Sequence, residues 1–189
     1  MRVFMKLSLS KRKAEKKSEK GLIRHRGNIP AVIYSKGKEN HYISVNGNDF
    51  NALLRQIPQG HLPTTVIELE GEGLSLKAIV KDIQYEATTY NILHLDFLEL
   101  QSERPINVNV PIRCVGVADC PGIKLGGFLR QVMRHLKVNC LPKDMPKELL
   151  IDIKDLGIKQ TKRIKDLVVP GAVTPLASMN EVIVVIAKR

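Results

Sequence analysis

The stretch TTVIELEGEGLSLKAIVKDIQ, residues 64–84, decides the fold class of this chain. It contains two runs in which apolar and polar residues alternate, separated by a Gly-Glu-Gly turn. Successive side chains of a β-strand point to opposite faces, so each run can bury one face and leave the other in water. Two such runs joined by a glycine turn predict a β-hairpin. The sequence therefore indicates a mainly β protein.

Other stretches of the first hundred residues extend this pattern. Leu7 and Leu9 alternate with polar residues, which predicts a first strand followed by the Lys/Arg run as an ordered loop. The neighbouring stretches 29–35 and 41–45 are expected to pair as a second hairpin. The strand candidates after Leu9 are IPAVIYS (29–35), HYISV (41–45) and YNILHLDFLEL (90–100).

One segment between these strands has helical spacing instead. NDFNALLRQI (48–57) places Phe50, Leu53 and further apolar residues three to four positions apart. We expect a short amphipathic helix with Asn48 as its N-cap, ended by Pro58.

The second half of the chain is also rich in strand patterns. The character of the sequence changes after QSERP (101–105), so we expect a first domain at 1–100 and a second at 101–189. PGIKLGG is typical of a flexible turn, and 127–142 is compatible with a helix or with strands. Both domains are expected to be β-rich with short helices, as barrels or sandwiches. The second-domain strand candidates are INVNVPIRCVGV (106–117), KELLIDI (147–153) and EVIVVIA (181–187).

The charge of the chain favours an anionic partner. The formal net charge is +11, and residues 1–36 hold 11 basic against 2 acidic residues, a local charge of +9. Such an uneven distribution suggests contacts with nucleic-acid phosphates first and with a membrane surface second. Simple solubility, or a disordered basic tail, are the alternatives. No apolar run approaches the ~20 residues of a membrane span, so no membrane role is expected.

Catalysis, metal binding and secretion find little support. Cys114, Cys120 and Cys140 are odd in number and lack CxxC spacing, which indicates reduced thiols and a cytoplasmic protein. The histidines show no metal-ligand spacing, and no nucleophile elbow or phosphate-binding Gly-Lys-Ser/Thr loop is present. We therefore expect no enzyme, no metal and no cofactor.

The residues His94 and Asp96 are the most informative polar pair. In LHLDF (93–97) strict alternation would place Leu93, Leu95 and Phe97 in the core and this pair on the opposite face. An aspartate in a basic protein can accept hydrogen bonds from base amino groups, and a histidine can donate to a base or stack on it. A solvated face or an internal ion pair is the alternative.

An RNA partner is favoured over DNA by what the chain lacks. It shows no helix-turn-helix, zinc finger or long basic helix. A β-sheet surface with a basic segment suits the wide minor groove or an irregular RNA helix. Tyr34, followed by Ser35 and Lys36, could stack on a base or donate its hydroxyl group, although it could equally be a core residue of its strand.

Three ordered motifs give the chain a family resemblance. RHRGNIPAVIYSKGK, then VKDIQ, then LHLDF resemble the bacterial large-subunit ribosomal protein 25 family, which binds 5S ribosomal RNA and includes the general stress protein CTC. The second half, from VNVPIRCVGV to MPKELLIDIKDL, resembles the C-terminal domain of the long family members. The resemblance covers nearly the whole chain.

The resemblance implies a fold, a partner and a set of contacts. The fold is a six-stranded N-terminal β-barrel that binds the loop E region of 5S rRNA in the central protuberance of the large subunit, on cytoplasmic ribosomes. A second β-rich domain follows and contacts rRNA or neighbouring ribosomal proteins. The implied RNA-binding residues are Arg12, Lys17, Arg24, Tyr34, Asp82, Gln84, His94 and Asp96, to which we add Lys20 for the reason given next.

The sequence departs from the family pattern at a few positions. Gly21 and Leu22 stand where arginines are frequent, and Ser35 stands where a glycine is usual. Some phosphate contacts are therefore expected to have moved to Lys20, His25 or Arg26. A stress-related RNA-binding or protein-interaction module acting off the ribosome is the alternative function.

Overall fold

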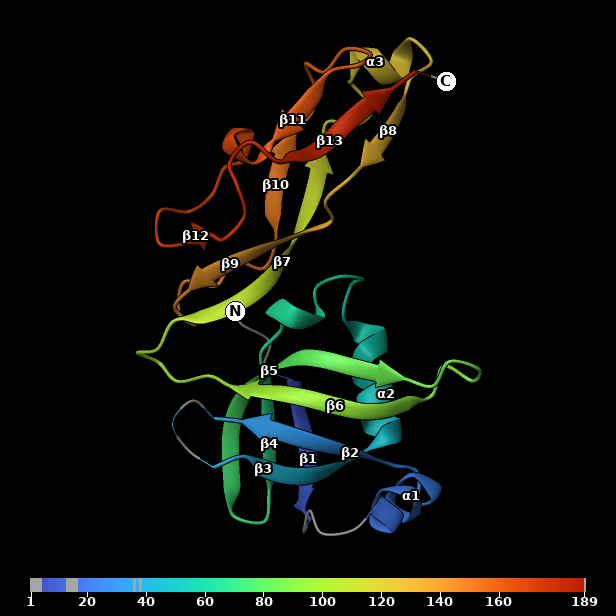
Figure 1. Ribbon diagram of the computed structural model, residues 1–189, viewed down its shortest axis with the longest axis vertical. Helices are drawn as coiled ribbons and strands as arrows, with labels where there is room; N and C mark the ends of the chain where they lie inside the picture. Colours follow the sequence, from blue (N-terminus) through green and yellow to red (C-terminus); the bar gives the residue numbers. More distant parts are fainter. Residues whose placement is uncertain (1–4, 13–16, 36, 38, 189) are drawn as a thin grey trace. The chain divides into compact units, whose positions relative to one another are not determined.

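The chain folds into two compact units with separate hydrophobic cores. The computed structural model describes residues 5–12, 17–35, 37 and 39–188 (Figure 1). The first unit spans Met1–Ser102 and the second Glu103–Arg189. The first is a closed six-stranded β-barrel and the second is built from two β-sheets. The expected mainly β fold with short helices is confirmed.

The barrel closes because its first strand pairs on both edges. Strand β1 is antiparallel to β3 and parallel to β4, so the order β1-β3-β2-β6-β5-β4 returns to β1. Strand β2 runs parallel to β6, and both expected hairpins, β2–β3 and β4–β5, are present. Full closure gives every strand of the barrel a partner on each edge. The strands are β1 Met5–Lys11, β2 Asn28–Tyr34, β3 His41–Asn46, β4 Ile67–Gly71, β5 Leu74–Tyr85 and β6 Ile92–Glu99.

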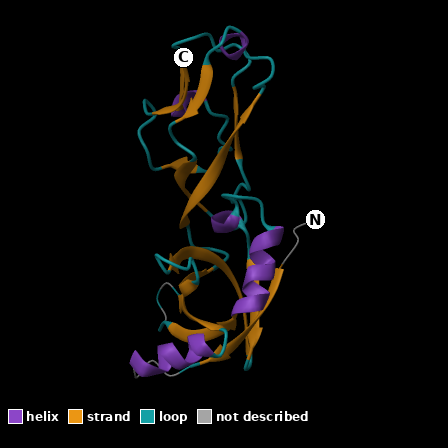
Figure 2. Cartoon of the chain, turned by 90° about the vertical axis from the view of Figure 1, so that its right-hand side faces the viewer, coloured by secondary structure: helices purple, strands orange, loops and turns teal. Residues whose placement is uncertain are grey.

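Alternate apolar residues fill the barrel. Leu7 and Leu9 of β1 point inward, as their alternation predicted, and meet side chains such as Ile33, Leu69 and Phe97. Phe97 and Leu95 are fully buried. The ring of strands is visible in Figure 2, where the helices of this unit lie outside it. Burial of these apolar side chains is the main stabilising term of the unit.

Helix α2, Gly47–Gln56, covers the barrel as expected but starts differently. It packs against β1 and β3 and buries Phe50 and Leu53 in the barrel core. Its N-cap is Asn46 and not the predicted Asn48. The Asn46 side-chain oxygen accepts hydrogen bonds from the backbone N–H groups of Asn48 and Asp49, at 2.8 and 3.4 Å. The helix therefore begins directly at the end of β3.

The expectation of an ordered loop after β1 is wrong for residues 17–25. These residues form helix α1, Lys17–His25, which packs on β2. The segment KSEKGLIRH is rich in good helix formers, and Glu19 near its start and Arg24 near its end complement the helix dipole. The many positive charges of this segment led to the prediction of a loop and obscured its helix propensity.

The second unit is organised around strand β7, Ile106–Val115. It pairs antiparallel with β9 and parallel with β10, in a sheet of order β10-β7-β9-β12. A three-stranded sheet of order β11-β13-β8 completes the unit. The other elements are α3 Pro121–Lys124, β8 Phe128–Gln131, β9 His135–Cys140, β10 Leu149–Asp152, β11 Thr161–Arg163, β12 Thr174–Pro175 and β13 Val182–Ala187, with one-turn 3-10 helices at Ile164–Asp166 and, in the first unit, Leu62–Thr64.

Two ambiguous segments of the second unit are resolved by this arrangement. Residues 127–142 form two strands, β8 and β9, which belong to different sheets. The predicted flexible turn PGIKLGG contains one helical turn, α3. The three cysteines are free, and burial raises the pKa of the Cys114 and Cys140 thiols, which keeps them protonated and unreactive.

Gly71 sits where barrel closure leaves no room for a side chain. A Cβ at this position would lie 2.0 Å from the carbonyl oxygen of Leu9 on β1. The next two residues, Glu72 and Gly73, both have positive φ values, 45° and 77°, and form the hairpin turn between β4 and β5. A Cβ on Gly73 would meet open space.

We expect Gly71→Ala to destabilise the barrel much more than Gly73→Ala. The first change forces β1 and β4 apart and should cost about 3 kcal/mol or more. The second imposes only the strain of a left-handed backbone, about 1–2 kcal/mol. Urea unfolding of the full chain, followed by circular dichroism, measures both. Equal losses of stability would show that the β1–β4 approach does not limit stability.

Candidate nucleic-acid interface

Two irregularities in the β5–β6 pairing decide which side chains leave the barrel. Val80 pairs with Phe97 but Asp82 pairs with Asp96, so Lys81 is an extra residue in β5. Ala78 and Val80 point into the core before it, and Ile83 packs against the core after it. An unbroken strand would have turned Asp82 and Gln84 inward, because side chains alternate with period two. The bulge at Lys81 turns them outward.

A second bulge corrects the prediction for Leu93. Gln84 pairs with His94 and Tyr85 with Ile92, which leaves Leu93 as the extra residue of β6. Ile92 packs against the barrel core, whereas Leu93 is not part of it. The placement of Leu93 in the core is therefore wrong, while that of Leu95 and Phe97 is confirmed. Simple alternation cannot show where a strand carries an extra residue.

Five of the predicted site residues meet on three neighbouring strands. Asp82 lies opposite Asp96, and Gln84 lies opposite His94, across the β5–β6 ladder. Tyr34, on β2, stands on the other side of β6. We call this set, Tyr34, Asp82, Gln84, His94 and Asp96, the polar face.

Asp96 is the centre of the polar face. One carboxylate oxygen lies 2.7 Å from Nδ1 of His94, and the other accepts a hydrogen bond of 3.3 Å from the Tyr34 hydroxyl group. The side chains of His94 and Asp96 are only 15% and 21% exposed. If Nδ1–H donates to Asp96, the neutral imidazole presents Nε2 as an acceptor. A carboxylate has about four lone-pair sites, so Asp96 can still accept from a ligand.

Burial raises the pKa of the Tyr34 phenol above its ordinary value, and the charge of Asp96 and its hydrogen bond raise it further. Tyr34 is 38% exposed and hydrogen-bonds Asp96 within the polar face, so the core-residue alternative is wrong. Its hydroxyl group stays protonated and is held in one orientation by Asp96.

The basic residues that were predicted to contact RNA differ in their surroundings. Arg24 donates two hydrogen bonds, of 3.1 and 3.0 Å, to the Leu93 carbonyl oxygen, which ties α1 to the bulge beside the polar face. Arg12 donates to the carbonyl oxygens of Ile43 and Ala31 and lies over the Tyr42 ring. Lys20 is exposed, and Lys17 begins α1 with a side chain that lies outside the described part. Arg12 and Arg24 thus have structural contacts that the sequence did not reveal.

The hairpin tip beside the polar face carries two tyrosines that sequence reasoning missed. Tyr85 and Tyr90 are 50% and 78% exposed, and Tyr90 has a φ of 57°. The tip is held by a Tyr90 N–H bond to the Glu86 carbonyl oxygen and by a contact of the Thr89 hydroxyl with the Glu86 carboxylate. In the sequence, the available signal for these tyrosines was that Tyr90 is an aromatic residue in a turn among polar residues.

The described part of the chain shows neither a metal site nor a membrane-spanning helix. Over those residues, no cluster of three or more His, Cys, Asp and Glu side chains could hold a metal ion. None of the described helices has the length and apolar character needed to cross a membrane.

Comparison with known proteins identifies the family. Residues 7–97 match the family model described as "Ribosomal L25p family", and residues 105–189 match "Ribosomal protein TL5, C-terminal domain". The chain is 44% identical to the large ribosomal subunit protein bL25 of Chlamydia muridarum over 98% of this chain and all of the relative. The chain belongs to the ribosomal L25p family. The bL25 proteins of Chlamydia trachomatis serovar L2 and Chlamydia pneumoniae are 45% and 43% identical over the same shares.

Membership of the L25p family confirms the resemblance drawn from the three motifs. VKDIQ and LHLDF supply the outward residues of β5 and β6, and PAVIY supplies β2 with Tyr34 at its end. The matched segments 7–97 and 105–189 lie in the first and second units respectively. The chain is therefore a ribosomal protein of the long, two-domain type.

Deletion of Lys81 should leave the barrel folded with Asp82 and Gln84 still outward. Without the extra residue, Val80, Asp82 and Ile83 alternate regularly opposite Phe97, Asp96 and Leu95, so Ile83 stays against the core. Loss of the bulge should lower the free energy of unfolding by about 1–2 kcal/mol, and Lys81→Ala, which keeps the bulge, by about 1 kcal/mol or less. Urea unfolding followed by circular dichroism compares the two variants. Loss of cooperative unfolding in the deletion variant would argue against Lys81 as the extra residue.

Tyr34 should ionise at higher pH than an ordinary tyrosine. The ultraviolet absorbance of tyrosinate, titrated in the full chain and in Tyr34→Phe, isolates this residue by difference. Its midpoint should lie above the ordinary value of 10.0, because burial and Asp96 disfavour the phenolate. Asp96→Asn should lower the midpoint only in part, since burial is the larger cause. A midpoint at or below the ordinary value would show that Tyr34 is not held in this way.

Proposed function

We propose that this chain is a structural protein of the large ribosomal subunit that binds the irregular loop E region of 5S rRNA through the polar face of its barrel. The supporting observation is the convergence of Tyr34, Asp82, Gln84, His94 and Asp96 on neighbouring strands. The relatives named as large-subunit proteins support the location, and the cytoplasmic ribosome is the corresponding compartment.

The polar face is costly for stability alone. Asp82 and Asp96 are directly opposite each other, and like charges on facing strand positions repel. Their negative charge also opposes the attraction of RNA phosphates to the cations of α1. Selection for stability or for general RNA affinity would remove both carboxylates. Specific acceptance of hydrogen bonds from base amino groups accounts for keeping them.

Geometry suits an irregular helix better than a regular one. The side chains of the polar face project from a β-sheet, which cannot enter the deep, narrow major groove of A-form RNA. Non-standard pairs widen the groove and expose base edges to such a surface. Arg24 fixes α1 beside Leu93. The cations of α1, including Lys20, can therefore contact the phosphates that flank the exposed bases.

Within the polar face, the roles follow from the hydrogen bonds. Asp96 orients His94 and Tyr34, which leaves the imidazole Nε2 and the tyrosine ring directed toward a ligand. Asp82 and Gln84 are exposed and can hydrogen-bond base edges. Arg12 is tied to the barrel carbonyl groups, so its contribution to RNA contact is through its remaining N–H groups.

The test compares two matched variants on two RNAs. Asp96→Asn and Asp49→Asn each remove one negative charge, and Asp49 lies on α2, away from the polar face. The probes are 5S rRNA and a transcript whose loop E is replaced by regular pairs. We expect Asp96→Asn to weaken binding to 5S rRNA by about 1–3 kcal/mol, roughly 5- to 150-fold in Kd. Asp49→Asn should bind as wild type or slightly tighter.

Two results would contradict the proposal. A chain that binds both RNAs equally, and only weakly at physiological salt, is a non-specific polycation. Tighter binding of Asp96→Asn to 5S rRNA would mean that the carboxylate acts only as a repulsive charge. Circular dichroism of each variant confirms that the barrel is intact.

A further inference from the structure

A second concentration of charge lies in the second unit, far along the chain from the polar face. Residues 103–189 hold 15 basic and 8 acidic residues, a formal charge of +7. Residues 37–102 hold 4 basic and 9 acidic residues, a formal charge of −5, which offsets much of the +9 of residues 1–36. The second unit is therefore more positive than the barrel unit as a whole. A charge of this size needs its own explanation.

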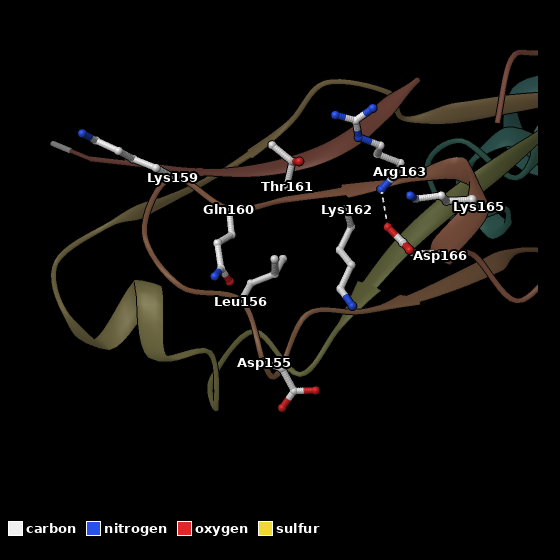
Figure 3. A pocket seen from close by; sticks show the side chains of 9 residues that line it. All are labelled: Asp155, Leu156, Lys159, Gln160, Thr161, Lys162, Arg163, Lys165 and Asp166. Carbon is white, nitrogen blue, oxygen red and sulfur yellow. Dashed lines mark hydrogen bonds between the residues drawn. The ribbon is translucent and has the colours of Figure 1, made fainter. Parts of the chain in front are cut away.

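Part of this charge lines a hollow of about 530 Å³ beside strand β11 (Figure 3). Four cations and two carboxylates line it together with three other side chains. We call it the basic hollow. Its residues are Asp155, Leu156, Lys159, Gln160, Thr161, Lys162, Arg163, Lys165 and Asp166.

The cations of the basic hollow are not neutralised by the carboxylates that the structure describes. Among the described residues, no carboxylate lies within ion-pair distance of Lys159, Lys162, Arg163 or Lys165. The Asp166 carboxylate instead accepts a bond of 2.9 Å from the backbone N–H of Arg163, which caps the short helical turn after β11. The Arg163 guanidinium donates to the Asn180 carbonyl oxygen at 3.3 Å and has further N–H groups to offer.

Two of these cations, Lys162 and Arg163, lie on opposite faces of β11. In Figure 3, Gln160 and Lys162 point toward Leu156 and Asp155, whereas Thr161 and Arg163 point to the opposite side. Strand β11 is an edge of its sheet, because it stands at the end of the order β11-β13-β8. A ligand along this edge can therefore meet cations from both faces.

Lys159 occupies a strained backbone conformation at the rim of the hollow. Its φ is 66°, in the left-handed region that costs an ordinary residue about 1–2 kcal/mol. The position is fixed by the bond from the Lys159 N–H to the Ile186 carbonyl oxygen and by that from Ile186 N–H to the Gln160 carbonyl oxygen. Glycine would adopt this conformation without strain, so the lysine side chain is retained at a cost.

We propose that the basic hollow binds the phosphate backbone of ribosomal RNA, as a second RNA contact made by the second unit. This inference rests on the proposed function, since it requires the chain to lie in an RNA-containing particle. The contact reads no sequence, because lysine and arginine on phosphates position a protein without identifying bases. It fixes where the second unit lies on RNA while the polar face supplies specificity.

The residues that line the basic hollow favour a polyanionic ligand over a small molecule. Pockets for small ligands are lined mostly by apolar and aromatic side chains, whereas Leu156 alone is apolar among the described residues that line the basic hollow. Gln160 accepts the Gly157 N–H at its side-chain oxygen, at 2.8 Å, so its amide N–H groups remain as donors for a ligand. Cations and neutral donors along an exposed strand edge suit successive phosphates.

The test removes three charges from the hollow and three from elsewhere in the same unit. The triple variant Lys159→Gln/Lys162→Gln/Lys165→Gln is compared, in the full chain, with Lys124→Gln/Arg134→Gln/Lys137→Gln, three positions with exposed side chains. The probe is a regular RNA duplex, for which the polar face has no preferred site. We expect the first variant to lower the salt slope of log K by about 2, at roughly 0.7–0.9 for each phosphate that is no longer neutralised. The control variant should lower the slope by less than about 1.

Equal slopes for the two triple variants would overturn the proposal, because net charge alone would then explain binding. The result is separate from the loop E test, since Asp96→Asn should bind the regular duplex as wild type does. An unaltered chain without loop E preference, whose duplex binding still depends on the hollow lysines, would reject the proposed function of the polar face and not this site.

Lysine acetylation of the unaltered chain gives an independent measurement. In purified large ribosomal subunits, Lys159, Lys162 and Lys165 should be acetylated more slowly than in the free chain, and Lys124 and Lys137 should not. Ribonuclease treatment should abolish this protection. Protection that survives the nuclease would assign the hollow to a protein partner, and equal acetylation in both states would leave it without any partner. Either outcome overturns the proposal.

Discussion

Closure of the barrel by β1 is the constraint on which the first unit depends. Strand β1 pairs with β3 on one edge and β4 on the other, so every strand of the barrel has two neighbours. The absence of a side chain at Gly71 lets β4 approach the Leu9 carbonyl oxygen closely enough to pair. A closed barrel fixes the order β2-β6-β5, and this order brings the residues of the polar face together.

Bulges then decide what the closed barrel presents to solvent. A closed sheet with strict alternation would bury Asp82 and Gln84 and would place Leu93 in the core. The extra residues Lys81 and Leu93 reverse the alternation locally, and the carbonyl group freed at Leu93 receives Arg24 from α1. The bulge at Lys81 therefore turns polar side chains outward, and the bulge at Leu93 attaches the cationic helix beside them.

The two units divide the proposed recognition of RNA between specificity and position. In the barrel, carboxylates are kept at facing positions despite their repulsion, which the proposed hydrogen bonds to bases would explain. In the second unit, cations without an ion-pair partner among the described residues lie along a strand edge, which suits contact with phosphates. A chain that binds RNA at two places gains overall affinity because the two contacts are covalently linked. Neither surface then needs a higher affinity of its own.

The sequence by itself determined the mainly β class, both N-terminal hairpins, helix α2 and the family, because alternation, turn residues and ordered motifs are local signals. It also named Tyr34, Asp82, Gln84, His94 and Asp96 through the family resemblance. Only the tertiary structure decided that these residues adjoin, since barrel order and bulges depend on pairing between distant strands. Helix α1, the N-cap at Asn46 and the basic hollow likewise needed the fold, because charge density along a chain does not show which cations remain unpaired in space.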